Sequence, residues 1–141
     1  MIPVNEPDLS GNEKKYLQEC IDTGWISSEG PFVERLEEGM VKQTGRKHAF
    51  AVCNGSAALE LAIKAIGLCP GDEVIMPSFT FVTTATSFSN MGINIRFVDV
   101  RSDTLNIDEN KIEEAITKNT KAIVPVHYAG VSCEMDRINK I

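Results

Sequence analysis

The sequence lacks a long apolar run. None of its 141 residues fall in a segment approaching the roughly 20 apolar residues that a membrane-spanning helix needs. Its first eight residues contain neither the basic stretch nor the apolar stretch of a secretion signal. These absences argue against a membrane protein and lead us to expect a cytoplasmic location.

Basic residues are also few. The chain has 14 lysines and arginines against 20 aspartates and glutamates, which gives a formal net charge of -6. The basic residues are dispersed among acidic ones, so they form no patch suited to a nucleic-acid backbone or an anionic membrane surface. We therefore expect no nucleic-acid partner and no membrane partner.

Cysteine and histidine are scarce as well. The four cysteines are irregularly spaced without a Cys-x-x-Cys motif, and His48 and His127 are the two histidines. This pattern argues against a disulfide framework and against a zinc ribbon, so we expect reduced thiols and no metal site. A zinc site that uses Cys133 and His127 is the alternative left open.

The remaining composition is that of an ordinary globular protein, with 43% hydrophobic and 24% charged residues. A compact chain of this length can bury roughly two-thirds of its unfolded surface. It is therefore long enough to form a real hydrophobic core.

Residues 1–46 predict a helical lead-in segment. Ser10 and Glu13 have the spacing of a capping box, which predicts a helix over residues 11–23 that ends at Gly24. Its expected packed side consists of Tyr16, Leu17, Cys20 and Ile21. A loop follows, and then a second helix from Pro31 to just before Gly45. The expected core face of this second helix consists of Val33, Leu36, Met40 and Val41.

Residues 47–141 predict a different organisation, in which short strands alternate with helices. The expected strands are 49–53, 73–76, 94–99 and 122–127, and the expected helices are 56–66, 80–91 and 109–117. Such alternation implies right-handed crossovers, and hence an α/β fold whose mainly parallel sheet has helices on both faces.

The last predicted strand suggests that this sheet is incomplete. Residues 122–126 are nearly all apolar, as expected of a strand covered on both faces, yet only residues 134–141 remain to cover it. We therefore expect a truncated fold, or a missing layer that comes from another chain.

The turn at residues 53–57 joins a predicted strand to a predicted helix, and it is a candidate phosphate site. The first amides of a helix have no internal partners and carry the positive end of the helix dipole. A phosphate can accept from the amides of Ser56 and Ala57 and from the serine hydroxyl, while Gly55 permits a close approach to the backbone. The alternative is that Ser56 is an ordinary helix N-cap.

Phe81 lies one strand–helix unit later and is a candidate wall for a flat ligand. Parallel neighbouring strands bring Ser56 and Phe81 to the same carboxyl-end crevice, where ligands usually bind in open α/β sheets. A stacked aromatic contributes about 0.5–1.5 kcal/mol beyond its buried area. The alternative is a core aromatic, a duty for which Phe79 is the natural candidate.

Other polar residues give weaker signals for catalysis. His127 ends a predicted strand at the ligand-binding edge, where it either positions a substrate or forms a structural hydrogen bond. Asp99, Asp103 and Asp108 lie in a polar loop without a histidine or a second acid in an apolar setting. The sequence offers no lysine in the desolvated setting that a Schiff base requires. We therefore assign no catalytic residue within this chain.

Several segments match, in order, motifs of a known group of enzymes. They are Gly24–Gly30, Asn54–Leu59, Gly71–Val82, Phe97–Val100, Val126–Gly130 and Glu134–Asp136. Together they resemble the N-terminal portion of the DegT/DnrJ/EryC1/StrS family, and the match covers essentially the entire chain. The resemblance implies a fold-type I transferase that uses pyridoxal 5'-phosphate to aminate a nucleotide-linked keto sugar.

By this resemblance, glutamate donates the amino group, and the sugar is a 4-keto-6-deoxy sugar used for surface polysaccharides. Ser56 and Ala57 match the family's phosphate-binding pair, with Gly55 beside them, and Phe81 matches the aromatic that stacks on the cofactor ring. Residues 47–141 then form part of the cofactor-binding large domain. Family members are typically dimers, so we expect a homo-oligomer.

The departures from the family pattern are equally informative. The family's catalytic lysine, its partner of the pyridine nitrogen and its smaller C-terminal domain all match positions beyond Ile141. We therefore expect weak or absent cofactor binding and no transaminase turnover from this chain alone. The alternatives are a non-catalytic binding or assembly module of the same fold, or part of a sugar dehydratase in which histidine replaces the lysine.

Overall fold

A computed structural model describes residues 5–141 and divides the chain into two compact units, Met1–Ala51 and Val52–Ile141. The predicted division between residues 46 and 47, which separates a helical lead-in segment from part of a cofactor-binding domain, stays a prediction. Within residues 5–141, no helix combines the length and the apolar composition needed to cross a bilayer.

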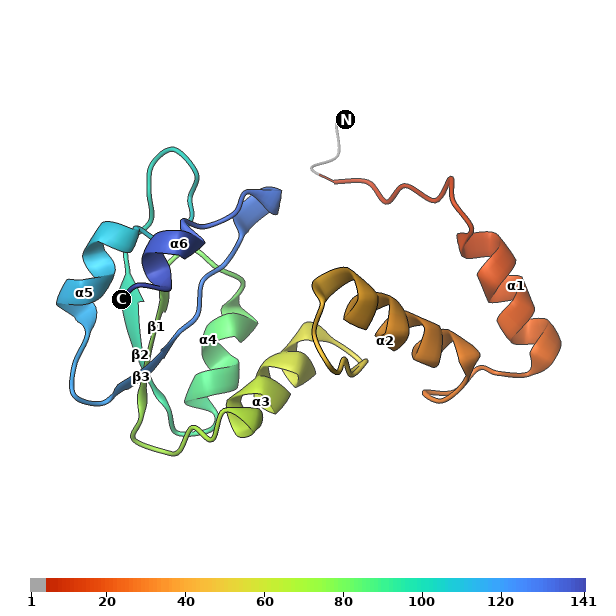
Figure 1. Ribbon diagram of the computed structural model, residues 1–141, viewed down its shortest axis with the longest axis horizontal. Helices are drawn as coiled ribbons and strands as arrows, with labels where there is room; N and C mark the ends of the chain where they lie inside the picture. Colours follow the sequence, from red (N-terminus) through yellow and green to blue (C-terminus); the bar gives the residue numbers. More distant parts are fainter. Residues whose placement is uncertain (1–4) are drawn as a thin grey trace. The chain divides into compact units, whose positions relative to one another are not determined.

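The N-terminal unit contains two helices, α1 (Glu13–Thr23) and α2 (Pro31–Thr44) (Figure 1). Each ends at a glycine in the left-handed conformation, as predicted for Gly24 and Gly45. The predicted capping box is wrong, because α1 begins after Asn12 without a side-chain cap. Ser10 instead donates its amide to the Asp8 carboxylate, at 3.0 Å.

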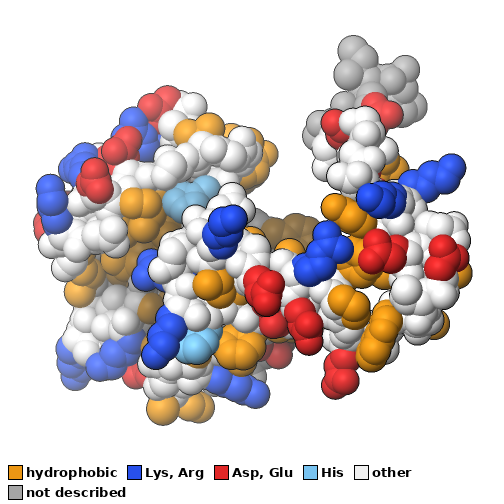
Figure 2. Space-filling model, turned by 45° about the vertical axis from the view of Figure 1, so that its right-hand side comes forward, with side chains coloured by type: hydrophobic (Ala, Val, Ile, Leu, Met, Phe, Trp, Pro, Cys, Tyr) orange, Lys and Arg blue, Asp and Glu red, His pale blue; other side chains and the backbone are white. Residues whose placement is uncertain are grey.

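The apolar faces predicted for these two helices are largely exposed, and neither helix has a buried residue. Leu17 is 65% exposed and Leu36 is 57% exposed. The helices meet through an aromatic pair, with the Tyr16 and Phe32 ring centroids 5.3 Å apart. Figure 2 shows hydrophobic side chains on the surface of this unit among charged ones. The expectation of a packed side is therefore wrong for these leucines, since residues 5–51 supply no second layer to cover them.

The second unit is built on a parallel sheet of three strands in the order β2-β1-β3 (Figure 1). The strands are β1 (Glu73–Pro77), β2 (Asn94–Val98) and β3 (Thr120–Ile123). The helices are α3 (Gly55–Ala65), α4 (Val82–Ser89), η1 (Glu109–Lys111), α5 (Ile112–Ala115), η2 (Tyr128–Gly130) and α6 (Met135–Ile138). Parallel strands joined through helices confirm the predicted α/β fold.

Two hydrophobic clusters lie on opposite faces of this sheet. Val74 and Met76 join the residues of α3 and α4 in one cluster, and Ile75 joins those of α5 and α6 in the other. All three side chains are completely buried. Because successive residues of a strand point to opposite faces, β1 contributes to both clusters and is the centre of the core.

Glu73 opens β1 and holds the amino-terminal ends of the three strands together. Its carboxylate accepts from Arg96 of β2 at 3.2 Å and from the hydroxyls of Thr117 and Thr120 at 2.9 Å. These hydrogen bonds, that from Arg96 first, lower the pKa of Glu73 below its usual value.

The strand predicted over residues 49–53 is absent from the described residues. This segment pairs with no strand, and Phe50 is 75% exposed. A side-chain contact to this segment comes from the Glu37 carboxylate, which accepts from the Ala51 amide at 2.8 Å. An apolar alternation becomes a strand only where a neighbour supplies the ladder of hydrogen bonds. Glu34, Glu37 and Glu38 have a pattern typical of a solvated helix face, but Glu37 also makes this contact.

Candidate functional site

A cavity of about 480 Å³ lies at the carboxyl-end edge of the sheet. Its walls come from the turn after β1 and from the segment after β3, which is where open α/β sheets usually bind ligands. The lining residues are Phe79, Thr80, Phe81, Thr84, Val126, His127, Tyr128 and Ala129. Phe81 and the segment around His127, both predicted to face this edge, therefore share one cavity.

Phe81 presents a largely free ring on this cavity, with 74% of its surface exposed. It directly precedes the first residue of α4 and has extended backbone angles. The core-aromatic alternative is therefore wrong for Phe81 in this chain. Its exposure fits the predicted role of stacking on a flat ligand, and that role stays a prediction.

Phe79 also lines the cavity, although it is the natural candidate for a core aromatic. Its ring meets that of Tyr128 edge to face, with the centroids 4.9 Å apart. The buried aromatic of this unit is Phe88 of α4. Sequence reasoning thus missed an aromatic pair, whose one available signal was that both residues follow strand ends.

The segment after β3 is held by buried contacts. The Asn106 side chain accepts from the Tyr128 amide at 2.9 Å and donates to the Val131 carbonyl at 3.0 Å. The Cys133 amide donates to His127 Nδ1 at 3.0 Å, and its thiol donates to the Val126 carbonyl at 3.2 Å. His127 therefore makes a structural hydrogen bond through its Nδ1.

The same contacts bear on the zinc hypothesis. His127 Nδ1 and the Cys133 thiol are both engaged with the backbone, and burial raises the pKa of the Cys133 thiol. In the part of the chain that the structure describes, no three His, Cys, Asp or Glu side chains gather closely enough to hold a metal ion. The structure gives this hypothesis no support.

The predicted phosphate turn forms the first turn of α3. Asn54 is the N-cap, and its side chain accepts from the Ala57 amide at 2.9 Å. The alternative that Ser56 is the cap is therefore wrong, because Ser56 lies one residue inside the helix. Ala57 N–H is already taken, so the first turn offers an anion the amides of Gly55 and Ser56.

Gly55, Ser56 and Ala57 are not among the residues that line the cavity. They lie at the start of α3, a helix that packs against α4, which itself begins after Phe81. A Cβ built at Gly55 meets no atom within 4 Å, so the space beside this turn is open. The predicted close approach to the backbone is sterically possible.

The cavity lining described for this chain contains no lysine. Lys64 is in the last turn of α3, at the opposite end from the proposed phosphate turn, and it is exposed. That no lysine here occupies a Schiff-base setting stays a prediction.

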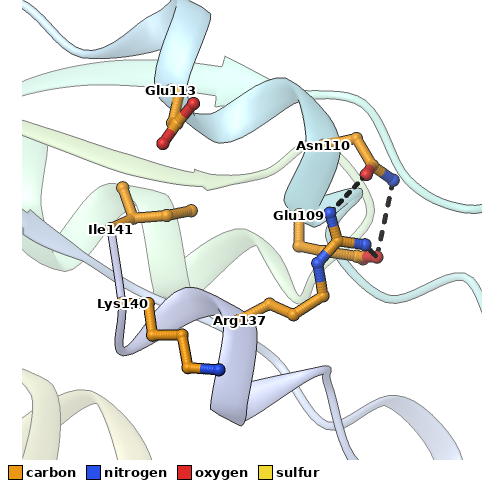
Figure 3. Close-up of a pocket in the computed structure, with 6 residues that line it drawn as sticks. All are labelled: Glu109, Asn110, Glu113, Arg137, Lys140 and Ile141. Atoms are coloured by element: carbon orange, nitrogen blue, oxygen red, sulfur yellow. Dashed lines mark hydrogen bonds and ion pairs between the residues drawn. The ribbon is translucent and has the colours of Figure 1, made fainter.

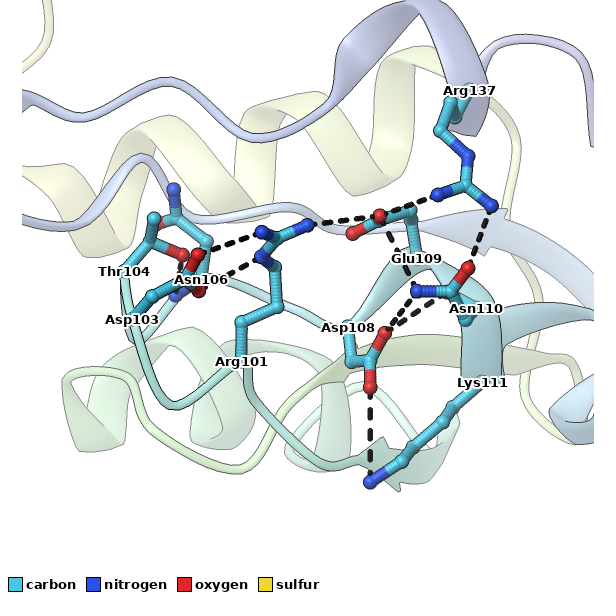
Figure 4. Close-up of polar contacts among 9 residues, drawn as sticks. All are labelled: Arg101, Asp103, Thr104, Asn106, Asp108, Glu109, Asn110, Lys111 and Arg137. Atoms are coloured by element: carbon cyan, nitrogen blue, oxygen red, sulfur yellow. Dashed lines mark hydrogen bonds and ion pairs between the residues drawn. The ribbon is translucent and has the colours of Figure 1, made fainter.

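A charged cluster that the sequence did not reveal surrounds Glu109, whose side chain is buried (Figure 4). Arg101 and Arg137 donate to its Oε1 at 3.1 Å and 2.7 Å. The Arg101 guanidinium also binds Asp103 and lowers the pKa of that carboxyl to about 2. Asp99, Asp103 and Asp108 are therefore parts of ion pairs and hydrogen bonds, which argues for a structural role.

Glu109 also lines a second cavity of about 510 Å³, between the η1–α5 segment and α6 (Figure 3). The other lining residues are Asn110, Glu113, Arg137, Lys140 and Ile141. This cavity is lined by charged groups and lacks aromatic side chains. The aromatic side chains expected beside a flat ligand are thus found in the smaller cavity at the strand ends.

Comparison with known proteins places these features in context. Residues 7–141 match the model of the DegT/DnrJ/EryC1/StrS aminotransferase family. The chain is 46% identical over 140 residues to the GDP-perosamine synthase of Caulobacter vibrioides, covering 99% of this chain and 38% of that protein. The chain therefore spans little more than a third of the length of this relative.

Solved structures show the same relation. A putative sugar aminotransferase from Streptococcus pneumoniae in its PMP form superposes with a TM-score of 0.89 at 33% identity, covering 99% of this chain and 35% of that chain. A GDP-4-keto-6-deoxymannose-3-dehydratase with a trapped PLP-glutamate geminal diamine gives a TM-score of 0.88 at 34% identity, covering 98% and 37%.

Proposed function

Because this chain belongs to the DegT/DnrJ/EryC1/StrS aminotransferase family, we propose that it forms the N-terminal part of a pyridoxal-phosphate-dependent aminotransferase for nucleotide sugars. The proposed reaction transfers an amino group from glutamate to a nucleotide-linked 4-keto-6-deoxy sugar in polysaccharide biosynthesis. Similarity to a GDP-perosamine synthase supports this substrate class. The observation that carries the proposal is the cavity with the exposed ring of Phe81. Phe81 directly precedes α4, and α4 packs against α3, whose first turn is open.

The residues present fit two parts of the cofactor. The Gly55 and Ser56 amides and the Ser56 hydroxyl suit a phosphate, because a helix N-terminus favours an anion. The largely exposed ring of Phe81 suits the pyridine ring. Gly55 keeps the approach to these amides open.

The chemistry of the bound cofactor is to supply an electron sink for amino-group transfer. Within this chain, Ser56 would hold the phosphate, and Phe81 would fix the tilt of the ring and cover one of its faces. The wall formed by Phe79 and Tyr128 would shield the site from water. Since the described lining offers no amine to hold or move a proton, we propose that this chain does not turn over alone.

A second candidate function is sugar dehydration, which the similarity to a GDP-4-keto-6-deoxymannose-3-dehydratase supports. We also propose a cytoplasmic location and a homo-oligomer. The oligomer is supported by the apolar side chains on α1 and α2, which resemble a surface that another subunit covers.

Titration of the purified chain with pyridoxal 5'-phosphate tests this proposal. The double variant Ser56→Ala, Phe81→Ala should weaken binding at least about ten-fold, the equivalent of one lost hydrogen bond and one lost stacking contact. A matched control is Ser102→Ala with Phe97→Ala, because both residues are exposed and lie outside the cavity and the α3 turn. Equal affinity of the two double variants would refute the proposed site.

Gly55→Ala gives a sharper test of the phosphate turn. The added methyl group meets no protein atom within 4 Å, so folding should be unaffected or stabilised by up to about 1 kcal/mol. Cofactor affinity should fall, because the methyl group occupies the approach to the first-turn amides. Unchanged affinity in a stably folded variant would place the phosphate elsewhere.

Reduction with borohydride tests the missing nucleophile. We expect no single lysine to be labelled by the cofactor after reduction and peptide mapping. Stoichiometric labelling of one lysine would contradict the prediction that this chain contains no Schiff-base lysine.

A further inference from the structure

We propose that Asn106 is a positioning residue for the cavity at the strand ends, because its side chain holds the loop that carries Tyr128. The inference rests on the proposed function in one respect, namely that this cavity receives the cofactor ring. Asn106 itself does not line the cavity. Its effect on a ligand must therefore pass through the loop of residues 128–131.

The Asn106 side chain joins the two ends of this loop. Its Oδ1 accepts from the Tyr128 amide at 2.9 Å, and its Nδ2 donates to the Val131 carbonyl at 3.0 Å. The residue is only 2% exposed, so water does not compete effectively for these bonds. A side-chain amide can accept and donate at once, which is what this loop requires.

The two Asn106 side-chain hydrogen bonds, called the clamp below, join two segments that each contain a residue in a strained backbone conformation. Ala129, inside the loop, has a φ of 50°, and Leu105, directly before Asn106, has a φ of 60°. Within residues 5–141, they are the two non-glycine residues with positive φ. Such conformations persist where surrounding contacts fix them, and they cluster at functional sites.

Asn106 is itself firmly held. Its carbonyl accepts from the Arg101 amide at 2.9 Å, and its amide donates to the Thr104 hydroxyl at 3.3 Å. The Arg101 guanidinium then binds both Asp103 and the buried Glu109, which closes the turn that carries Asn106 (Figure 4). The charged cluster thus anchors the clamp, which gives it a role in the candidate site.

The consequence for the site lies in the aromatic wall. Tyr128 takes its position from the loop, and its ring meets Phe79 edge to face at 4.9 Å. Both rings line the cavity. The loop also has backbone hydrogen bonds of its own, from the Tyr128 amide to the Val126 carbonyl and from the Val131 amide to the Tyr128 carbonyl, both at 3.0 Å. Without the two Asn106 bonds, these would remain, but the loop and the wall would be held less firmly.

Asn106→Ala tests the clamp directly. Amide hydrogen exchange at Tyr128 should become several-fold faster, because the amide loses its bond to Asn106 and keeps the one to the Val126 carbonyl. Amides of β1 are the internal reference for global stability. The matched control is Asn119→Ala, which removes an exposed asparagine side chain on the turn before β3. Equal exchange at Tyr128 in both variants would overturn the proposal.

Asn106→Asp adds a signature that a general loss of stability does not produce. A protonated carboxyl can accept from the Tyr128 amide and donate to the Val131 carbonyl, so it restores both bonds. The ionised carboxylate lacks the donor and faces a carbonyl oxygen. Protection of the Val131 amide, which closes the loop by donating to the Tyr128 carbonyl, should therefore be near that of the unaltered chain at low pH, once corrected for intrinsic exchange. It should fall as pH rises through the pKa of the carboxyl, which burial raises. A pH dependence identical to that of the unaltered chain would overturn the proposal.

Affinity for pyridoxal 5'-phosphate, measured on the same samples, separates this inference from the proposed function. We expect Asn106→Ala to weaken binding several-fold while Asn119→Ala leaves it unchanged. Cofactor binding that depends on Ser56 but ignores Asn106 would overturn the positioning role and leave the proposed function standing. If the unaltered chain binds no cofactor, which the expectation of weak or absent binding allows, the exchange data alone decide whether Asn106 positions the loop.

Discussion

Helix α1 in the N-terminal unit and helix α3 in the sheet unit both have 11 residues, but only α3 has a buried residue, Ile63. Both helices show apolar residues at helical spacing. The difference is that α3 packs against α4 and joins one of the two core clusters, whereas the apolar face of α1 stays exposed.

This contrast separates two sources of helix stability. Helices of this length are marginal in water by themselves, and packing of an apolar face supplies most of their stability in proteins. Residues 52–141 contain that packing, on both sides of β1. In residues 5–51 the two helices have well-formed ends and share an aromatic contact, but no side chain is buried. An amphipathic pattern therefore tells which face needs a cover, and not which element provides it.

The largest expected effect is in hydrogen exchange. Amides of α1 should be protected less than about ten-fold. Those of Ile75 and Met76 should be protected more than about a thousand-fold, because their hydrogen bonds break only when the core unfolds. Exchange measured by mass spectrometry or NMR at low protein concentration checks this. Strong protection of α1 that disappears on dilution would show that a second copy covers it.

Truncating a core side chain should have the next largest effect. Ile75→Ala should lower the free energy of unfolding by about 2–5 kcal/mol, because it leaves a cavity in a fully buried site. Leu36→Ala removes a side chain that is mostly exposed and should change stability by no more than about 0.5 kcal/mol. Urea denaturation of both variants makes the comparison. Equal losses would mean that the N-terminal unit has a core of its own.

Glu109→Gln tests the charged cluster of the sheet unit. The substitution removes the carboxylate that Arg101 and Arg137 share, and we expect a loss of about 1–3 kcal/mol, since both arginines remain partly exposed. The neighbouring Glu113→Gln is the matched control, because Glu113 is exposed and lies on the same stretch of chain. Thermal or urea unfolding checks the difference, and equal stability of the two variants would contradict a structural role for the cluster.

The smallest effect concerns pH. The pKa of Glu73 is lowered in the folded chain, so its ionised form contributes stability above the usual carboxyl pKa of 4.5. That contribution should be lost as pH falls below about 4.5 towards the lowered value. Urea midpoints between pH 6 and pH 3 should therefore fall more steeply for the unaltered chain than for Glu73→Gln. Parallel pH profiles would show that the contacts of Glu73 add no stability.

Much of the fold could be predicted from sequence because its signals are local. Apolar runs flanked by turn residues located β1 and β2, and glycines located the ends of α1 and α2. The predicted strand at residues 49–53 was wrong because strand formation requires a neighbour, which sequence periodicity does not contain.

The candidate site shows the same limit. The rule that ligands bind at strand ends led to Phe81 and the segment around His127, and the structure places both on one cavity. It did not reveal the Phe79–Tyr128 pair or the salt bridge between Glu109 and Arg137, which lie 28 residues apart in sequence. Contacts between distant residues leave no periodic trace. The roles of Gly55, Ser56, Ala57 and Phe81 stay predictions that the titrations decide.

The buried central strand raises a question of strand slippage. All residues of β1 after Glu73 are buried, so its apolar pattern alone would tolerate a shift by one residue that exchanges the two faces. Glu73 breaks that ambiguity, since a slipped strand would carry its carboxylate away from Arg96, Thr117 and Thr120. One charged residue at the start of the strand thereby selects a single alignment during folding, and a one-residue insertion between Glu73 and Val74 should produce misaligned, aggregation-prone chains.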